Sequence, residues 1–273
     1  GFSGGFAAFA TEDAMELGRV GGMLEGDMAD VMSTPVLQVS TPLLESQTVA
    51  KENGSYGKWT FSLMRSVSEV PPKRLHLIRH GESVYNHQLS YSKNWEDPTV
   101  FDPPLTKKGT KQCLALREKL WGIRGLETAL WVVSPLSRAI DTLIYSCPYD
   151  VGEMARRGQC VVRHEVTEFL QTTGDIGLPA SFLKNKYPEL SSGMEELPEV
   201  WWYGNMESNN IFKERCTQFE TKTNELDRVE KFKQFIYSRP EDVIICVGHS
   251  LFWKHFSRSN DGLKNCDMME MTL

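Results

Sequence analysis

The feature that most constrains the fold is an alternation, from residue 73 onward, of short apolar runs with longer segments of helical periodicity. Pro71 and Pro72 mark the start of this part of the chain. The predicted strands are 74–79, 129–133, 159–163 and 242–247, and the predicted helices are 106–124, 134–145, 180–186, 209–238 and 251–257. Strands separated by helices form a parallel sheet covered on both faces. We therefore expect an α/β fold, a three-layer α/β/α sandwich with a mainly parallel sheet.

Residues 1–72 lack this alternation and form a compositionally separate segment. They carry nine acidic and four basic residues, whereas residues 73–273 carry 27 and 26. The segment is rich in Gly, Ala, Ser and Thr and has no sustained period of 3.6 or 2. We predict a poorly structured acidic N-terminal extension over 1–72 and a single folded domain over 73–273.

The composition excludes several classes of protein. The near-neutral charge of 73–273 lacks the basic field of a nucleic-acid binder. No apolar run approaches the roughly 18 residues of a membrane span, so we expect no membrane partner and a cytoplasmic protein. Because the chain opens with Gly1, organellar (plastid) targeting by a missing N-terminal segment stays open. The six cysteines are widely spaced, which favours small core residues over a structural metal site. No pattern fixes the oligomeric state.

Polar side chains follow each predicted strand at the point where it ends. In chain order they are Arg79 and His80, then Ser134 and Arg138, then Glu168, and finally His249 and Ser250. In sheets of this kind, ligands bind beyond the carboxyl ends of the strands. We therefore expect two histidines, two arginines and one carboxylate to converge on one crevice.

This set of residue types suits phosphoryl transfer. The guanidinium groups of Arg79 and Arg138 match phosphate oxygens and neutralise the transferred group. They also disfavour protonation of His80, whose neutral imidazole is a competent nucleophile. His249 offers a further donor to the equatorial oxygens. Glu168 is placed to protonate the leaving oxygen and then to activate the hydrolytic water.

Backbone donors would complete such a site. Helices begin near Ser83, Ser134 and Ser250, and their N-terminal N–H groups would face an anion. The arginines and histidines supply the positive charge that a cation would otherwise provide. We therefore expect neither a metal ion nor an organic cofactor.

Four sequence blocks carry a resemblance to a known family. They are HLIRHGESVYN at 76–86, DPPLTKKGTKQ at 102–112, VVSPLSRAIDT at 132–142 and IICVGHS at 244–250. Their order and spacing resemble the histidine phosphatase, or phosphoglycerate-mutase-like, superfamily, in the branch with a single Arg-His-Gly motif. The resemblance covers 73–273 and implies that these residues form a catalytic domain with a phosphoglycerate-mutase-like fold. It implies His80 as nucleophile, with Arg79, Arg138 and His249 completing the phosphate pocket and Asn86 near the transferred phosphate.

Two residues are candidates for the general acid, Glu168 and Glu165. Family members often place it in a Leu-x-Glu pattern in the loop after the third strand, and Val166-Thr167-Glu168 fits that form. Thr167 stands where the family frequently has arginine. Glu165, three residues earlier, is the second candidate, although it lies closer to the strand.

A softer resemblance concerns the run EFLQTTGDIGLPASFLKNKYPEL and the aromatic triplet Trp201-Trp202-Tyr203 that follows it. These are similar to a plant and algal subgroup of phosphoglycerate-mutase-like proteins. The triplet either lines the substrate mouth or belongs to core or lid packing, and the second is the more common role of such a cluster. The remaining histidines, at 76, 87, 164 and 255, lack a motif and are interpreted as structural.

Three functions are compatible with these patterns. The leading hypothesis is a phosphomonoesterase acting on a small phosphorylated substrate or a phosphoprotein. The second is a cofactor-dependent phosphoglycerate mutase, which the chain disfavours because it lacks the mutase pattern Glu-Arg-His-Tyr-Gly near the acid. The third is a non-catalytic phosphate-binding protein, which usually loses the nucleophile or an arginine, whereas this chain retains both.

Overall fold

The computed structural model describes residues 72–91, 97–204 and 219–273. The predicted N-terminal extension over 1–72 lies, except for Pro72, outside the described residues. The described strands form one five-stranded sheet in the order β3-β2-β4-β1-β5. The strands are β1 (Arg74–Arg79), β2 (Leu130–Val133), β3 (Cys160–Val162), β4 (Val243–Gly248) and β5 (Met268–Thr272). The first four are parallel, and β5 runs antiparallel to β1 at one edge.

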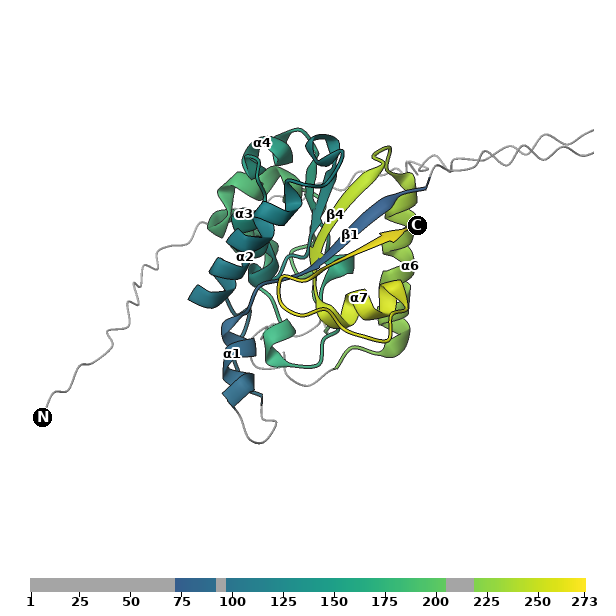
Figure 1. Cartoon of the computed structure of the whole chain (residues 1–273). Coiled ribbons are helices and arrows are strands. Elements are labelled where there is room, and N and C mark those ends of the chain that lie inside the picture. Colours follow the sequence, from purple (N-terminus) through teal and green to yellow (C-terminus); the bar gives the residue numbers. More distant parts are fainter. Residues whose placement is uncertain (1–71, 92–96, 205–218) are drawn as a thin grey trace, which may run out of the picture. The chain divides into compact units, whose positions relative to one another are not determined.

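Helices cover both faces of this sheet, which confirms the predicted three-layer α/β/α arrangement (Figure 1). The first face packs against α2 (Lys107–Leu120), α3 (Ser137–Ser146), α4 (Val151–Arg156) and α5 (Ala180–Lys186). The second face packs against α6 (Lys222–Ser238) and α7 (Ser250–Ser257). A short helix, α1 (Val84–Tyr91), follows β1.

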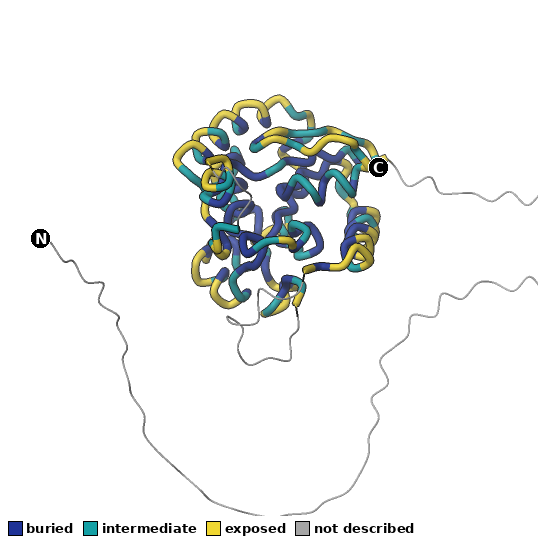
Figure 2. The backbone as a smooth tube through the Cα atoms, turned by 90° about the horizontal axis from the view of Figure 1, so that it is seen from below, coloured by how far each residue is buried: buried dark blue, intermediate teal, exposed yellow. Residues whose placement is uncertain are grey.

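Each face of the sheet has its own hydrophobic core, because successive side chains along a strand point to opposite faces. In β4, Ile244 and Cys246 face the α6 and α7 side, whereas Ile245 and Val247 face the α2 and α3 side. All four are fully buried, as expected for a parallel strand covered on both faces. Figure 2 shows this burial in the strands and on the inner faces of the helices, with the outer turns exposed.

Helix α2 begins where the sequence predicts and ends earlier. Thr106 is its N-cap, and the Thr106 side chain accepts a hydrogen bond from the Gly109 N–H. The predicted end at residue 124 is wrong, because the helix stops at Leu120 and Trp121 is the C-cap. The following turn contains Gly125 with φ 84°, a left-handed conformation that glycine adopts at little cost.

The predicted start of the next helix at Ser134 is also wrong. Helix α3 begins at Ser137, and the carboxylate of Asp102 caps it from a distant loop. Asp102 Oδ1 accepts from the Ser137 N–H over 2.8 Å, and Oδ2 accepts from the Ser137 hydroxyl over 2.5 Å. The Ser134 hydroxyl lies before this helix, where it accepts from the Leu136 N–H over 3.4 Å and is hydrogen-bonded to His249 Nε2. A long-range cap thus replaces the local one.

The helix predicted over 209–238 is shorter in its described part. Residues 205–218 lie outside the described residues, and α6 begins at Lys222 after the N-cap Thr221. The backbone of Thr221 is extended (ψ 149°), and its side chain accepts a hydrogen bond from the Asn224 N–H. These two features fix the start of the helix at this position. The interpretation of Phe219 as a helical residue is therefore wrong.

The remaining helices and strands, and the cysteines, agree in part with their predictions. Helix α5 and strand β1 have the predicted bounds, and α1 begins next to Ser83, where a helix start was predicted without an end; α4 and β5 were not predicted. The five described cysteines are buried free thiols, of which Cys113 and Cys266 are hydrogen-bonded to each other over 3.7 Å, and Cys216 lies outside the described residues. Within the described ranges, every helix is too short or too polar to cross a bilayer.

Candidate active site

The register of the sheet brings the predicted site residues together. Arg79 pairs with Gly248 at the ends of β1 and β4, so the next residues, His80 and His249, leave adjacent strands side by side. Their ring centroids are 5.1 Å apart. Both rings are buried, with exposed fractions of 3% and 0%. Strand β2 ends next to the two histidines, and Ser134 is the residue that follows it. The Oγ atom of Ser134 lies 2.7 Å from His249 Nε2.

Hydrogen bonds fix the tautomer of His80. Its Nδ1 lies 2.7 Å from the carbonyl oxygen of Gly81, which can only accept, so Nδ1 carries the hydrogen. In the neutral ring, Nε2 then holds the lone pair and accepts from Arg138 Nε–H over 3.2 Å. Burial, followed by the charges of Arg138 and Arg79, holds the pKa of His80 well below its ordinary value. The ring is therefore neutral near pH 7 with Nε2 as its nucleophilic atom.

The loop that carries His80 rests on the N-terminal turn of α2. A Cβ added at Gly81 would meet the Gly109 carbonyl oxygen at 2.9 Å, so the close approach requires glycine. The Gly81 N–H donates to Thr142 Oγ1 over 2.9 Å. The Glu82 N–H donates to Gln112 Oε1 over 2.8 Å. The sequence block at 102–112 thus supports the nucleophile loop.

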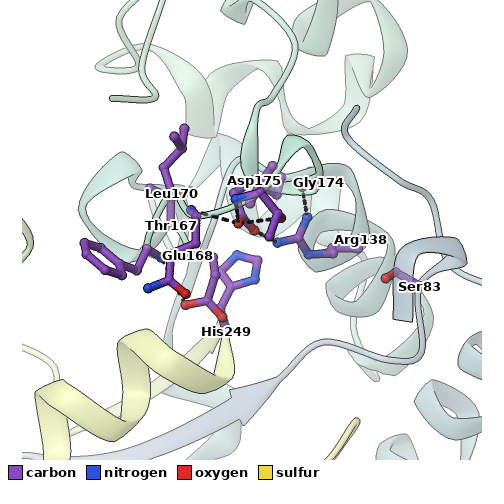
Figure 3. A network of polar contacts seen from close by, with 12 residues as sticks. Ser83, Arg138, Thr167, Glu168, Leu170, Gly174, Asp175 and His249 are labelled. Atoms are coloured by element: carbon purple, nitrogen blue, oxygen red, sulfur yellow. Dashed lines mark hydrogen bonds and ion pairs between the residues drawn. The ribbon is translucent and has the colours of Figure 1, made fainter. Parts of the chain in front are cut away.

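Arg138 is held by three contacts, and all of its nitrogens are engaged. Besides the bond to His80, its NH2 donates to Asp175 Oδ1 over 3.0 Å and its NH1 donates to the Gly174 carbonyl oxygen. The ion pair is buried, with side-chain exposures of 5% and 9%. Figure 3 shows Arg138 pointing toward Gly174 and Asp175, with His249 and Glu168 close by. Asp175 is therefore a site residue.

Arg79 and His249 present buried polar atoms toward this region. Arg79 NH1 donates to the Leu263 carbonyl over 2.9 Å, while its buried Nε has no hydrogen-bond partner among the described residues. His249 Nδ1 is likewise without a partner there. The pKa of His249 is well below its ordinary value because of burial and then the charge of Arg138. Unsatisfied buried groups of this kind are typical of a site that a ligand completes.

Asn86 is joined to the nucleophile loop by a residue from the far end of the chain. Asn265 Nδ2 lies 3.1 Å from Asn86 Oδ1 and 3.0 Å from the His80 carbonyl oxygen. Asn86 Oδ1 also accepts from the Ser83 N–H over 3.3 Å. Asn86 thus lies beside the nucleophile loop, and its predicted place near the transferred phosphate stays a prediction.

Glu168 has the environment of a proton donor. Its carboxylate accepts from the N–H groups of Leu251 and Phe252 at the start of α7, over 3.2 and 3.0 Å. Burial, and then the charge of Asp175, raises the pKa of Glu168 above its ordinary value. A carboxyl group with a raised pKa is protonated at higher pH, which a general acid requires.

Glu165, the alternative acid, is bound in an ion pair. Arg163 donates to its two oxygens through Nε over 3.0 Å and NH2 over 2.6 Å. Burial alone would raise the pKa of Glu165, but the hydrogen bonds from Arg163, the charges of His164 and Arg163 and a backbone hydrogen bond together outweigh it, and the pKa is lowered. The geometry therefore favours Glu168 over Glu165.

The predicted backbone donors are mostly engaged within the protein. The Ser134 N–H donates to the Val247 carbonyl, so it extends the sheet. The first N–H groups of α7 donate to Glu168, as described above. The Ser250 hydroxyl donates to the Leu263 carbonyl over 3.1 Å, next to the contact made by Arg79. A direct contact of Ser250 with phosphate stays a prediction.

The aromatic triplet packs in the core and also borders a cavity, and its place at a substrate mouth stays a prediction. Trp201 and Trp202 are buried in the core on the α3 side, with exposed fractions of 5% and 8%. Together with Tyr203 they also line a cavity that reaches Glu168 and Asp175. The triplet is thus core packing and one wall of a space beside the candidate acid.

Three residues of the site were missed from the sequence, namely Asp102, Asp175 and Asn265. Each acts from a loop or turn far from its partner along the chain, with separations of 35, 37 and 179 or more residues. Asp102 opens the sequence block at 102–112, but that block did not predict its role as a cap, and Asp175 had a local signal because Thr172 and Asp175 form a capping box around a short turn. No group of three or more potential metal ligands occurs among residues 72–91, 97–204 and 219–273.

Comparison with known proteins agrees with the resemblance seen in the sequence. Residues 75–149 match the model of the histidine phosphatase superfamily (branch 1), which confirms that resemblance; the similarity to a plant and algal subgroup stays a prediction. No curated protein matches the sequence. Among solved structures, a mycobacterial glucosyl-3-phosphoglycerate phosphatase is 19% identical, with a TM-score of 0.42 over 74% of this chain and 90% of its own. A phosphoglycerate mutase from Bacillus anthracis is 16% identical, with a TM-score of 0.44 over 74% and 88%.

Proposed function

We propose that this chain, which carries the histidine phosphatase pattern over residues 75–149, hydrolyses phosphate monoesters through a phosphohistidine at His80. The observation that carries the proposal is the tautomer of His80. The Gly81 carbonyl binds the hydrogen on Nδ1 and leaves the lone pair on Nε2, next to Arg138. An imidazole fixed in this way needs no further proton transfer before it attacks phosphorus.

The first step forms the N–P bond and breaks the P–O bond of the ester. Nε2 of His80 donates its electron pair to phosphorus, and the leaving oxygen takes the proton of Glu168. Arg79, Arg138 and His249 bind the equatorial oxygens and offset their charge. The Nδ1 hydrogen bond to Gly81 stabilises the ring as it becomes positively charged.

The second step reverses these roles. The carboxylate of Glu168 takes a proton from water, and the resulting hydroxide-like oxygen attacks phosphorus as the N–P bond breaks. Inorganic phosphate leaves, and His80 regains its lone pair. Under this proposal the arginines and histidines stabilise the negative charge on the phosphoryl oxygens, so the reaction proceeds without a metal ion.

Phosphate release from a generic aryl phosphate in EDTA tests the proposal. Wild type and His87→Ala should be active, and His80→Ala should be inactive. His87 is the matched control because it is an exposed histidine seven residues away. Activity in His80→Ala would overturn the mechanism. Rapid interconversion of 2- and 3-phosphoglycerate by wild type would overturn hydrolysis in favour of mutase activity.

A further inference from the structure

A cavity of about 230 Å³ lies beside the candidate acid. Glu168 and Asp175 form part of its lining, so it adjoins the side of the site where the leaving group is protonated. The other walls come from the aromatic triplet 201–203 and from Asn224, Asp227 and Lys231 on α6. Pockets that enclose drug-sized ligands span roughly 300–1,000 Å³. The cavity is therefore matched to a small group of one or two rings.

The cationic side chains that line the cavity are already neutralised. Arg228 donates to both oxygens of Glu220, over 2.7 and 2.8 Å. Its remaining NH1 donates to the carbonyls of Glu165 and Thr167. A second anion brought into the cavity would have to displace a buried carboxylate from this arginine.

The second cation is also paired, in a weaker and more exposed contact. Lys231 Nζ lies 2.7 Å from Asp227 Oδ2, and both side chains are more than half exposed, at 59% and 54%. His164 is held neutral because burial lowers its pKa. Among the described lining residues, no arginine or lysine is left without a carboxylate partner.

We infer that this cavity receives the leaving group and selects an uncharged, ring-containing alcohol, so that the substrates are sugar or nucleoside monophosphates. The inference rests on the proposed hydrolysis at His80. The aromatic walls offer apolar surface to the face or edge of a ring. The side chain of Asn224 offers hydrogen bonds to hydroxyl groups. A leaving group that bears a carboxylate or a second phosphate finds no free cation among the described lining residues.

Relative kcat/KM values in EDTA test this selection. Glucose 6-phosphate and 3-phosphoglycerate differ in the charge of the leaving group, and we expect the first to be favoured by roughly tenfold or more. Glycerol 3-phosphate has an uncharged leaving group that lacks a ring, and we expect its kcat/KM to fall below that of glucose 6-phosphate through a higher KM. Equal or better hydrolysis of 3-phosphoglycerate would overturn the inference.

A variant that frees a cation in the cavity tests whether the lack of a free cation causes the selection against charged leaving groups. Asp227→Asn frees the Lys231 cation at the cavity, so the ratio of kcat/KM for 3-phosphoglycerate to kcat/KM for glucose 6-phosphate should rise about two- to fivefold. Glu153→Gln is the matched control, because it removes an exposed carboxylate of α4 that pairs with Arg156 and Arg157 and does not line the cavity. An unchanged ratio in Asp227→Asn would contradict the inferred charge selection.

The same assays separate failure of the proposed hydrolysis from failure of the inference about the leaving group. If wild type releases no phosphate from an aryl phosphate, or if His80→Ala remains active, the proposed hydrolysis itself is wrong. If aryl phosphate is hydrolysed in a His80-dependent way but 3-phosphoglycerate is the better natural ester, only the inference about the leaving group is wrong.

Discussion

Arg138 Nε lies 3.2 Å from His80 Nε2, and the same guanidinium group forms a buried ion pair with Asp175. One side chain therefore orients the nucleophile and is itself oriented by a carboxylate. The two contacts place the Nε–H group of Arg138 at His80 Nε2, the atom where the phosphoryl group would be bound. They make the geometry of this arginine, and not only its charge, a determinant of the proposed reaction.

Substitution of Arg138 by lysine should impair catalysis even though the charge is kept. Lysine lacks the fork that contacts His80, Gly174 and Asp175 together, so we expect kcat to fall by about 10²-fold. The measurement is steady-state hydrolysis of an aryl phosphate, with the exposed Arg156→Lys as control. A variant Arg138→Lys with more than a tenth of the wild-type kcat would contradict this role.

Glu168→Gln and Glu165→Gln should have different effects. Loss of the proton donor in Glu168→Gln should lower kcat for an alkyl phosphate by about 10²- to 10⁴-fold. Glu165→Gln should keep kcat close to wild type and should lower the free energy of unfolding, because Arg163 loses its buried partner. Steady-state kinetics and urea unfolding of both variants separate these outcomes. The reverse pattern would identify Glu165 as the acid.

The pH dependence of kcat/KM should be bell-shaped, with limbs set by His80 and Glu168. Attack requires neutral His80, whose pKa is lowered by burial and Arg138, so the acid limb should lie below the ordinary value of 6.5. Proton donation requires protonated Glu168, whose pKa is raised by burial and Asp175, so the alkaline limb should lie above the ordinary value of 4.5. A measured acid limb above pH 6.5 would contradict the assignment of His80.

Asp175→Asn should move one limb of this profile. Removal of the Asp175 charge relieves the repulsion that raises the pKa of Glu168, so the alkaline limb should shift to lower pH. The control is Glu241→Gln, which removes a carboxylate paired with Arg239 just before β4, at the opposite end of that strand. A shift of equal size in both variants would show that the effect is not specific to the site.

Asp102→Ala should destabilise the protein more than loss of an exposed cap does. Asp102 is 6% exposed and accepts two hydrogen bonds from Ser137 at the start of α3. We expect a loss of about 1–3 kcal/mol in the free energy of unfolding, measured by urea denaturation. Asp150→Ala, which removes the exposed N-cap of α4, should cost less. Equal losses would contradict the long-range cap.

Much of the fold was predictable because parallel strands and capped helices leave local signals. Strand β1 and helix α5 match their predicted bounds, and Thr106 caps α2 as its pattern indicates. Strand β5 was missed because it lacks such signals: it is a half-exposed edge strand rich in methionine. Only the start of helix α1, near Ser83, was predicted, because the helix has one buried residue, Tyr85, and no apolar period that would show how far it extends.

The candidate site was predictable where its residues follow strands and less so where they arrive from loops. His80 and His249 meet because β1 and β4 are neighbours, which the strand order decides. Asp175 and Asn265 could not be placed, because their contacts depend on how distant loops fold back over the sheet. Ser134 illustrates the opposite case, in which a local helix-start pattern is overridden by a tertiary contact with His249.

Trapping of the phosphoenzyme tests the central claim most directly. In Glu168→Gln, an aryl phosphate with an activated leaving group should still phosphorylate His80, because that step needs little proton donation, while hydrolysis of the intermediate should be slowed. Rapid quenching followed by mass spectrometry and phosphorus NMR should find up to one acid-labile, alkali-stable phosphate per chain, on Nε2 of His80. Phosphate on another residue, or no phosphoenzyme in a variant that still releases the aryl alcohol, would contradict the account.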